Sequence, residues 1–279
     1  EVTEKGRIRQ SIQNCKYVLE YDPCLRGAVC RNEMNCQIDI KKKVPWKRRG
    51  VQMTDTDMNN LSLYLEKNYG LTSDRVIAKA IDIVANDNSF HPIIDLLESL
   101  KWDGRPRISG MLTHFFGAEN PEYAGEVMKI HMLAAISRLY EPGKKYDIML
   151  CLVGGQGTGK STFFKYLAIQ DEWFTDDVKR LDDKKVYEYL QGHWIVEMSE
   201  MNAVANAKSI EETKSFLSRQ KDTYRIPYER RAEDRYRQCV FCGTSNDLAF
   251  LPFDRTGNRR FGPVKVCPEK AVHMEGGRS

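Results

Sequence analysis

Residues 154–161 read Gly-Gly-Gln-Gly-Thr-Gly-Lys-Ser, a spacing that can bind the phosphates of a nucleotide. The glycines let successive backbone amides turn toward one anion. The Lys160 ammonium can bridge the β and γ phosphates, and the Ser161 hydroxyl can ligate Mg²⁺. The residues expected to contact ATP are Gly154, Gly155, Gln156, Gly157, Thr158, Gly159, Lys160, Ser161 and Thr162.

The flanks of this motif have the secondary structure that it requires. Residues 147–153 (DIMLCLV) form a continuous apolar run, which is typical of a strand buried on both faces, and residues 160–169 have a helical pattern. The helix N-terminus adds partial positive charge at the phosphates. The motif is therefore interpreted as a P-loop and not as an ordinary glycine-rich turn.

Two glutamates, Glu197 and Glu200, follow a second short apolar run at residues 194–196. One carboxylate can hold the magnesium through water while the other polarises the attacking water. The spacing does not assign these roles, and we favour Glu197 for the metal and Glu200 for the water. The alternative is a pair of surface glutamates after a core strand.

Two further candidates lie nearer the C-terminus. Asn246 follows a third apolar run at residues 239–244 and could hydrogen-bond the γ phosphate or orient the water, although Asn at a strand end is also a common turn former. Arg259 or Arg260 could stabilise the charge of phosphoryl transfer as an arginine finger. The alternative for each arginine is a structural or DNA-facing role.

The elements around these residues predict an α/β fold, in which a parallel sheet flanked by helices follows a mainly helical N-terminal region. Helices are expected at residues 57–69, ended by Gly70, from Ser73 to the His91-Pro92 break, at residues 93–100 and at residues 121–140. The expected domains are an N-terminal extension with a basic stretch (1–50), a helical domain (51–145), a P-loop ATPase domain (146–270) and a tail (271–279).

Composition limits the class of protein. The 279 residues are 29% charged and 41% hydrophobic, as in ordinary globular proteins, and no apolar run approaches the length of a membrane span. The start carries no secretory signal, so we expect a cytoplasmic protein without membrane partners, whose eight cysteines are reduced thiols. The absence of an initiator Met indicates a fragment or a processed start and leaves room for upstream domains.

Positive charge is concentrated in two segments, although the net charge is only +4. The segment from Lys41 to Arg49 holds six cations and no acid, and the segment from Arg219 to Arg237 holds seven cations and four acids. Because the rest of the chain is net acidic, these segments favour a polyanionic partner such as DNA. The alternative is a pair of solvated charged loops.

The chain from about Asp57 to Val264 resembles virulence-associated protein E, a bacterial prophage and mobile-element family similar to superfamily three helicases and AAA+ ATPases. The pieces that carry the resemblance, in the order of the family, are WDGRPR (102–107), PGKKYD (142–147), GGQGTGKST (154–162), WIVEMSEM (194–201), DTYRIPYERR (222–231), GTSN (243–246) and FLPFDRTGNRRF (250–261). One departure is that the acidic motif reads E-x-x-E and not two adjacent acids, which leaves the roles of Glu197 and Glu200 open.

The resemblance implies an ATPase that assembles as a ring, usually a hexamer, and serves replication of an element's DNA. It implies that the finger arginine acts on the neighbour's nucleotide. It also implies a hairpin that enters the channel of the ring, pairing residues 223–228 with 235–241 and presenting Arg230 and Arg231 to DNA.

The leading hypothesis is an ATP-driven DNA-translocating motor of the superfamily three helicase type. The alternative is a nucleotide-gated DNA-binding or ring-assembly module that does not unwind DNA. A P-loop kinase is a third hypothesis, disfavoured because Asn246 and the two arginines suit an oligomeric ATPase.

Overall fold

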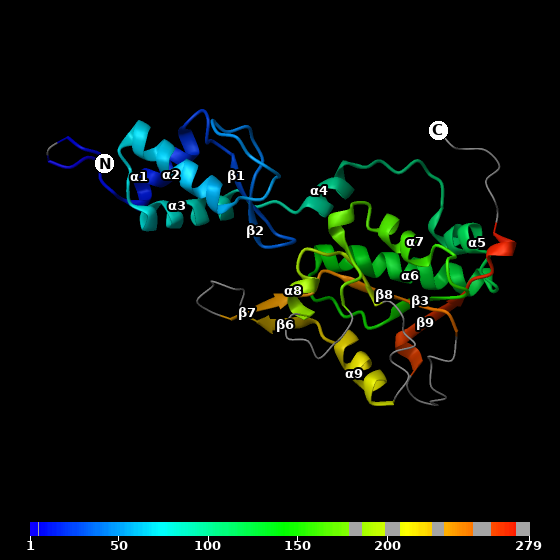
Figure 1. Ribbon diagram of the computed structural model, residues 1–279. Helices are drawn as coiled ribbons and strands as arrows, with labels where there is room; N and C mark the ends of the chain where they lie inside the picture. The colour runs from blue at the N-terminus through cyan, green and yellow to red at the C-terminus, as the bar shows by residue number, and fades with distance from the viewer. Residues whose placement is uncertain (5, 179–185, 199–206, 225–231, 248–257, 272–279) are drawn as a thin grey trace. The chain divides into compact units, whose positions relative to one another are not determined.

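The computed structural model describes residues 1–4, 6–178, 186–198, 207–224, 232–247 and 258–271. The chain forms two compact units, Glu1–Ser99 and Leu100–Ser279, each with its own hydrophobic core (Figure 1).

The first unit is mainly helical, as predicted, with one small hairpin. Its elements are α1 (Ile12–Tyr21), β1 (Val29–Asn32), β2 (Gln37–Ile40), α2 (Asp55–Tyr69), α3 (Asp74–Asp87) and α4 (Pro92–Ser99). Strands β1 and β2 pair antiparallel, and α1 packs against α3. Helix α2 ends at Gly70, which adopts the left-handed conformation of a C-cap, and α3 follows Ser73, so the helix ends that the sequence predicts here are confirmed.

Part of the basic stretch at residues 41–49 is a structural element of this unit. Arg48 Nε donates to Asp57 Oδ1 at 2.8 Å, and the Trp46 indole donates to the same oxygen at 2.9 Å. Asp57 also forms a capping box with Thr54 at the start of α2. Burial opposes ionisation of Asp57, but the hydrogen bonds from Arg48, Thr54 and Trp46 outweigh it and lower its pKa to about 2.

The second unit is built on a five-stranded sheet with the order β4-β5-β8-β3-β9, in which every neighbouring pair is parallel. The strands are β3 (Met149–Val153), β4 (Phe174–Thr175), β5 (Ile195–Met198), β8 (Val240–Ser245) and β9 (Phe261–Lys265). This sheet confirms the predicted α/β fold. Because all five strands run in one direction, their carboxyl ends lie at one edge of the sheet, where the loops that follow them meet.

Helices cover both faces of this sheet (Figure 1). They are α5 (Met111–Phe116), α6 (Pro121–Tyr140), α7 (Lys160–Leu167), α8 (Val186–Leu190) and α9 (Ala207–Leu217), with short 3₁₀ turns at residues 108–110, 171–173, 258–260 and 268–270. The first, third and fifth residues of β3 share a core cluster with residues of α8 and α9. Since side chains alternate along a strand, Leu150 and Leu152 face the opposite side, where α6 and α7 pack.

Helix α6 has the bounds predicted from its pattern and is fixed to the sheet by two buried polar side chains. Arg138, which is 1% exposed, donates to the carbonyls of Lys144, Tyr146 and Cys239. The Trp194 indole, at the start of β5, donates to the Ala135 carbonyl at 3.0 Å. The bonds from Arg138 satisfy carbonyls of the loop after α6 and of the residue before β8.

A separate hairpin joins β6 (Lys221–Tyr224) to β7 (Glu233–Tyr236), with Tyr224 opposite Glu233. The sequence-based pairing of 223–228 with 235–241 was therefore wrong in its second strand, because residues 240–245 form β8 within the central sheet. The apolar run of β8 belongs in a core, whereas β7 is polar and mostly exposed. The hairpin tip, residues 225–231, lies outside the described residues.

All eight cysteines are free thiols, as predicted, and three of them, Cys30, Cys151 and Cys242, lie in strands. Among the described residues, no helix combines the length and the apolar character needed to cross a membrane.

The ion pair between Arg48 and Asp57 leads to a prediction about stability. Replacement Arg48→Ala leaves a buried carboxylate without its cation and should lower the free energy of unfolding by about 2 to 3 kcal/mol. The matched control Lys47→Ala removes the same charge from an exposed neighbour and should change it by less than about 0.5 kcal/mol. Urea unfolding of the full chain measures both, and equal effects would contradict a structural role for Arg48.

The Arg48–Asp57 pair should also make the free energy of unfolding depend on pH. The pKa of Asp57 is lowered in the folded chain, so its contribution is complete above its unfolded value of about 4 and is lost as the pH falls toward 2. The Arg48→Ala variant should lose less stability than the parent chain over this range.

Candidate nucleotide-binding site

The loop between β3 and α7 forms a cradle at the edge of the sheet. Gly157 and Gly159 have φ values of +78° and +81°, a left-handed conformation that other residues adopt only with strain. Helix α7 begins directly after Gly159, so its first amides point toward the loop. A cavity of about 350 Å³ opens here, lined by residues 156–162 and 244–246. The structure thus brings most of the predicted phosphate-binding residues to one cavity.

The Lys160 side chain lies over this loop. Its ammonium donates to the carbonyls of Gly154 and Gly155, each at 2.7 Å, and lies 3.3 Å from the Thr158 hydroxyl. Lys160 is 7% exposed, and burial lowers its pKa, while the charge of Glu197 acts in the opposite direction. An anion bound in the cradle would contact the Lys160 ammonium, which is already in position and poorly hydrated.

A buried carboxylate lies beside the start of α7. Glu197 of β5 has an exposed fraction of 0%, and its Oε1 accepts from the Ser161 hydroxyl at 2.7 Å and from the Thr244 hydroxyl at 2.8 Å. Its Oε2 is also buried and has no hydrogen-bond partner in the part of the chain that the structure describes. Burial raises the pKa of Glu197, and the bonds from Ser161 and Thr244 oppose this rise.

The oxygen atoms around Glu197 suit a magnesium ion. A buried carboxylate oxygen without a donor, next to a serine hydroxyl, supplies the oxygen ligands that Mg²⁺ prefers. Magnesium at a nucleotide takes only one or two protein oxygens and completes its shell with phosphates and water. The absence of a cluster of three His, Cys, Asp or Glu side chains among the described residues is therefore compatible with such a site. The residues fit the ion.

The neighbouring strand contributes the polar residues on the other side of the cavity. Thr244 and Ser245 end β8, and Asn246 follows them as an exposed residue that lines the cavity. The Ser245 hydroxyl donates to the Asp247 carbonyl at 2.6 Å, which turns the chain at this point. The structure therefore brings Asn246 to the same cavity as Lys160 and Ser161, whereas Glu200 lies outside the described residues.

The two candidate arginines have different surroundings. Arg260 is tied within its own unit, with Nε 3.2 Å from Asp147 Oδ2 and 2.9 Å from the Ser218 hydroxyl. Arg259 is exposed and makes no hydrogen bond or ion pair with any residue that the structure describes. The geometry thus separates a structural arginine from one that is available to a partner.

A buried ion pair closes the root of the hairpin and links it to α9. Arg237 forms two bonds with the Asp222 carboxylate, at 2.6 and 2.9 Å, and donates to the Phe216 carbonyl at 2.6 Å. Its guanidinium also lies over the Phe216 and Phe241 rings. The predicted DNA contacts, Arg230 and Arg231, belong to the tip outside the described residues.

Sequence reasoning missed Thr244 as a member of the site, although a signal for it existed. Glu197 and Thr244 lie on the α7-facing side of adjacent parallel strands, because Val196 and Phe241 belong to the core on the other side. Strand alternation would have placed both side chains toward Ser161. Asp147 and Ser218 were also missed as partners of Arg260, and no local pattern marks them.

Comparison with known proteins adds a family to this geometry. The virulence-associated protein E-like domain matches residues 97–278. An A form apo structure of the NrS-1 C-terminal region is 16% identical over 93% of this chain and 62% of that one, with a TM-score of 0.52. A second such structure is 14% identical over 90% and 60%, with a TM-score of 0.51.

These identities establish similarity of fold only, and the chain spans about three fifths of the length of the NrS-1 structures. Comparison with curated proteins gives no match. The family match, however, covers about two thirds of the chain and includes the P-loop, Glu197 and Asn246. The chain therefore belongs to the virulence-associated protein E-like domain family and carries a nucleotide-binding domain of the P-loop NTPase type.

Proposed function

We propose that this protein is an ATP-hydrolysing DNA motor of the superfamily three helicase type, which acts in replication of a prophage or mobile element. The observation that carries the proposal is the group formed by Glu197, Ser161 and Thr244 beside the cradle of Lys160. A P-loop that catalysed no phosphoryl transfer would not need a carboxylate that is 0% exposed beside the serine of its motif.

In this proposal ATP binds through its phosphates to the amides of residues 154–162 and to Lys160, and Ser161 and Glu197 hold Mg²⁺. The ion, when bound, neutralises charge on the β and γ phosphates. Glu200 orients and deprotonates the attacking water, and Asn246 hydrogen-bonds the γ phosphate or that water. The position of Asn246 on the cavity supports its assignment.

We assign the arginine finger to Arg259, acting on the nucleotide of a neighbouring subunit in a ring, which we take to be a hexamer. The exposure of Arg259 and its lack of a partner among the described residues support this choice. Arg260 is unsuitable because Asp147 and Ser218 already occupy its guanidinium. A finger must reach the equatorial oxygens of the transferred phosphate, which requires an uncommitted side chain.

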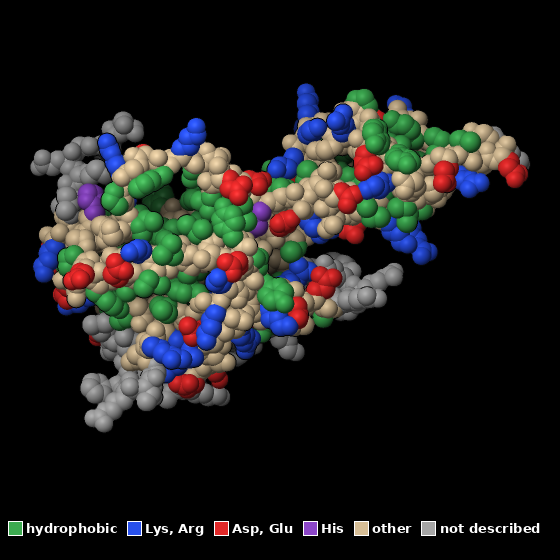
Figure 2. Space-filling model, turned by 180° about the vertical axis from the view of Figure 1, so that it is seen from behind, with side chains coloured by type: hydrophobic (Ala, Val, Ile, Leu, Met, Phe, Trp, Pro, Cys, Tyr) green, Lys and Arg blue, Asp and Glu red, His purple; other side chains and the backbone are tan. Residues whose placement is uncertain are grey.

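DNA is proposed to contact the hairpin tip through Arg230 and Arg231. Strand β8 supports a link between the hairpin and the nucleotide site. It begins close to the Arg237–Asp222 pair at the hairpin root, and Thr244 near its end lies beside Glu197. Elsewhere, Figure 2 shows Lys and Arg side chains interspersed with Asp and Glu, so the described surface in that view has no single basic face. Contact through backbone phosphates would give binding without sequence preference.

The second candidate is a nucleotide-gated DNA-binding or ring-assembly module without unwinding activity. It would use the same cradle and the same hairpin, so the residues described here favour neither candidate over the other. A strand-displacement assay discriminates them: unwinding with ATP but not with a non-hydrolysable analogue supports the motor. ATP hydrolysis without displacement of any strand supports the module.

The cradle assignment predicts that binding and hydrolysis can be separated. Lys160→Ala should lose ATP binding, whereas Glu200→Gln should bind ATP and hydrolyse it at least about a hundredfold more slowly. The control Lys165→Ala, one turn along α7 and exposed, should behave as the parent chain. Full affinity in Lys160→Ala would remove the cradle assignment, and slow hydrolysis in Glu197→Gln with normal hydrolysis in Glu200→Gln would reverse the two acidic roles.

The finger assignment predicts complementation between two inactive chains. Arg259→Ala and Lys160→Ala should each abolish ATPase activity, yet their mixture should recover part of it, because a Lys160→Ala subunit can offer Arg259 to an intact cradle. Arg260→Ala should instead lower the free energy of unfolding by about 1 to 2 kcal/mol, since it loses its bonds to Asp147 and Ser218. Absence of recovery in mixed samples that form rings would contradict a finger that acts between subunits.

The hairpin assignment predicts that single-stranded DNA stimulates the ATPase and that the double variant Arg230→Ala/Arg231→Ala loses this stimulation. The DNA affinity of this double variant should also depend less on salt concentration than that of the parent chain, because fewer counterions are released on binding. The control Lys67→Ala/Lys79→Ala removes the same charge from exposed sites in the first unit and should leave both properties unchanged. An active ATPase that is indifferent to DNA would remove the motor proposal.

A further inference from the structure

A second cavity opens beside the phosphate cradle within the same unit. It has a volume of about 560 Å³ and shares Gly159 and Thr162 with the first cavity, so the two are adjacent along the start of α7. Both volumes lie in the range of small-molecule sites. The sequence-based assignments gave this second cavity no role.

The walls of the second cavity are apolar and largely aromatic. Its lining side chains come from α5 and α7 and are Met111, Phe115, Phe116, Phe163, Tyr166 and Leu167. The ring centroid of Phe163 lies 5.2 Å from that of Phe116 and 6.5 Å from that of Phe115, so the two helices lie side by side here. Phe115 and Tyr166 are 53% and 79% exposed, which is unusual for rings of this size.

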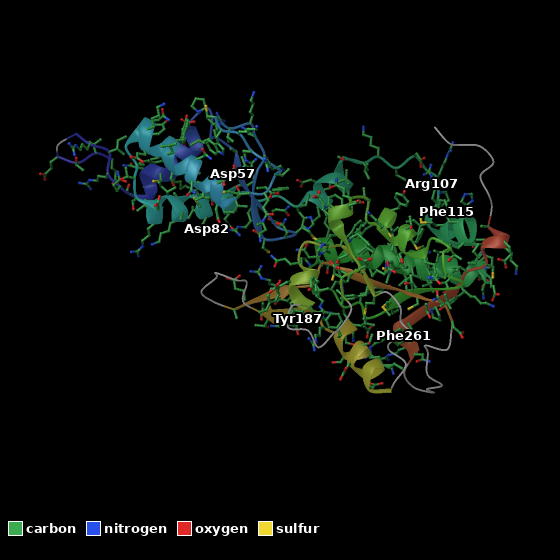
Figure 3. The ribbon with its side chains drawn as sticks, viewed as in Figure 1. Asp57, Asp82, Arg107, Phe115, Tyr187 and Phe261 are labelled. Atoms are coloured by element: carbon green, nitrogen blue, oxygen red, sulfur yellow. The ribbon has the colours of Figure 1, made fainter. Side chains whose placement is uncertain are left out.

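Phe115, labelled in Figure 3, belongs to helix α5. Gly117 ends the helix with φ +57°, and a Cβ atom at this position would lie 2.4 Å from the Cys267 carbonyl oxygen. The Cys267 amide donates to the Phe116 carbonyl at 2.8 Å. Because the chain that follows β9 is packed this closely on α5, the aromatic wall is formed without a ligand.

The order of residues along α7 gives the direction in which a nucleotide would lie. Lys160 and Ser161 face the terminal phosphates, Thr162 borders both cavities, and Tyr166 is one helical turn beyond Thr162 on the same side. When the β and γ phosphates of a nucleotide occupy the cradle, its flat nucleobase must lie beside the cradle. The aromatic cavity is adjacent to the cradle and offers rings on which a flat base can stack.

We infer that the cavity between α5 and α7 binds the nucleobase by stacking and does not select among bases, so that ATP, GTP, CTP and UTP are all substrates. This inference rests on the proposed function of the cradle as a triphosphate site. Phe115 and Tyr166 are the stacking residues, and every base presents a face on which an aromatic ring can stack.

The lack of selectivity follows from the polar groups of the cavity. Among the described residues that line it, the side-chain polar groups are the hydroxyls of Thr162 and Tyr166. A hydroxyl both donates and accepts, so it can pair with the edge of any base. Strong discrimination requires fixed donors and acceptors that an incorrect base would leave unpaired, whereas an apolar pocket distinguishes similar ligands weakly.

The test uses the full chain with Mg²⁺ and a fluorescent ATP analogue as the displaced probe. The competitors are ATP, GTP, CTP, UTP and inorganic tripolyphosphate, and hydrolysis of the four nucleotides is measured in parallel. The variant Phe115→Ala removes one stacking ring, and Phe115→Tyr restores it. The control Tyr21→Ala removes an aromatic ring from the first unit that is also highly exposed.

We expect the four nucleotides to compete within about tenfold of one another and to be hydrolysed at similar rates. Phe115→Ala should weaken all four by roughly tenfold, the order of one stacking contact, and leave tripolyphosphate unchanged. Phe115→Tyr and Tyr21→Ala should match the parent chain.

Three results would overturn the inference while leaving the cradle intact. They are a preference of more than about a hundredfold for one base, equal binding of tripolyphosphate and ATP, and unchanged nucleotide affinity in Phe115→Ala. In the last case the exposed rings would be a protein-contact surface. If neither tripolyphosphate nor any nucleotide binds, the proposed function fails and this inference fails with it.

Discussion

The burial of one carboxylate, Glu197, is the constraint around which the second unit is organised. A charged group inside a protein costs several kcal/mol unless it is paired or hydrogen-bonded. Glu197 receives two hydroxyl donors, from Ser161 and Thr244, but retains an oxygen without a partner among the described residues. A core strand has no structural need for such a residue, since valine would pack there at no electrostatic cost. Its presence is what the proposed magnesium site would explain, since the ion would bring positive charge to this carboxylate.

The parallel sheet makes this arrangement possible from residues far apart in the sequence. Ser161 follows β3, Glu197 belongs to β5 and Thr244 belongs to β8, which lies between the other two strands. Parallel strands deliver their carboxyl ends to one edge, and strand alternation turns Glu197 and Thr244 to the face that α7 covers. Strand β8 also connects this edge to the buried Arg237–Asp222 pair at the root of the hairpin. This strand is buried throughout.

The sequence predicted the parts of this fold whose signals are local. The glycine spacing of the P-loop, the apolar run of β3 and the bounds of α6 each depend on residues close together in the chain. Helix α1 was not anticipated, although Ile12, Cys15, Val18 and Leu19 recur at helical spacing and belong to the core of the first unit. The hairpin pairing was misjudged because β7 is polar on both faces and the apolar run beyond it was the stronger signal. The difference between Arg259 and Arg260 depends on contacts with residues 147 and 218, which lie far away in the sequence.

In the binding mode that we propose, the two cavities along α7 recognise different parts of a nucleotide by different interactions. The cradle offers oriented amides, an ammonium and a carboxylate with one oxygen that lacks a partner among the described residues, and their interactions depend on the number and charge of the phosphates. The aromatic cavity offers area and polarisable faces, which respond to the presence of a base but hardly to its identity. In a motor, the energy released depends on the γ phosphate, and the base serves only to hold the substrate. A site built to distinguish triphosphate from diphosphate therefore needs fixed polar groups at one end only, which is where the described residues place them.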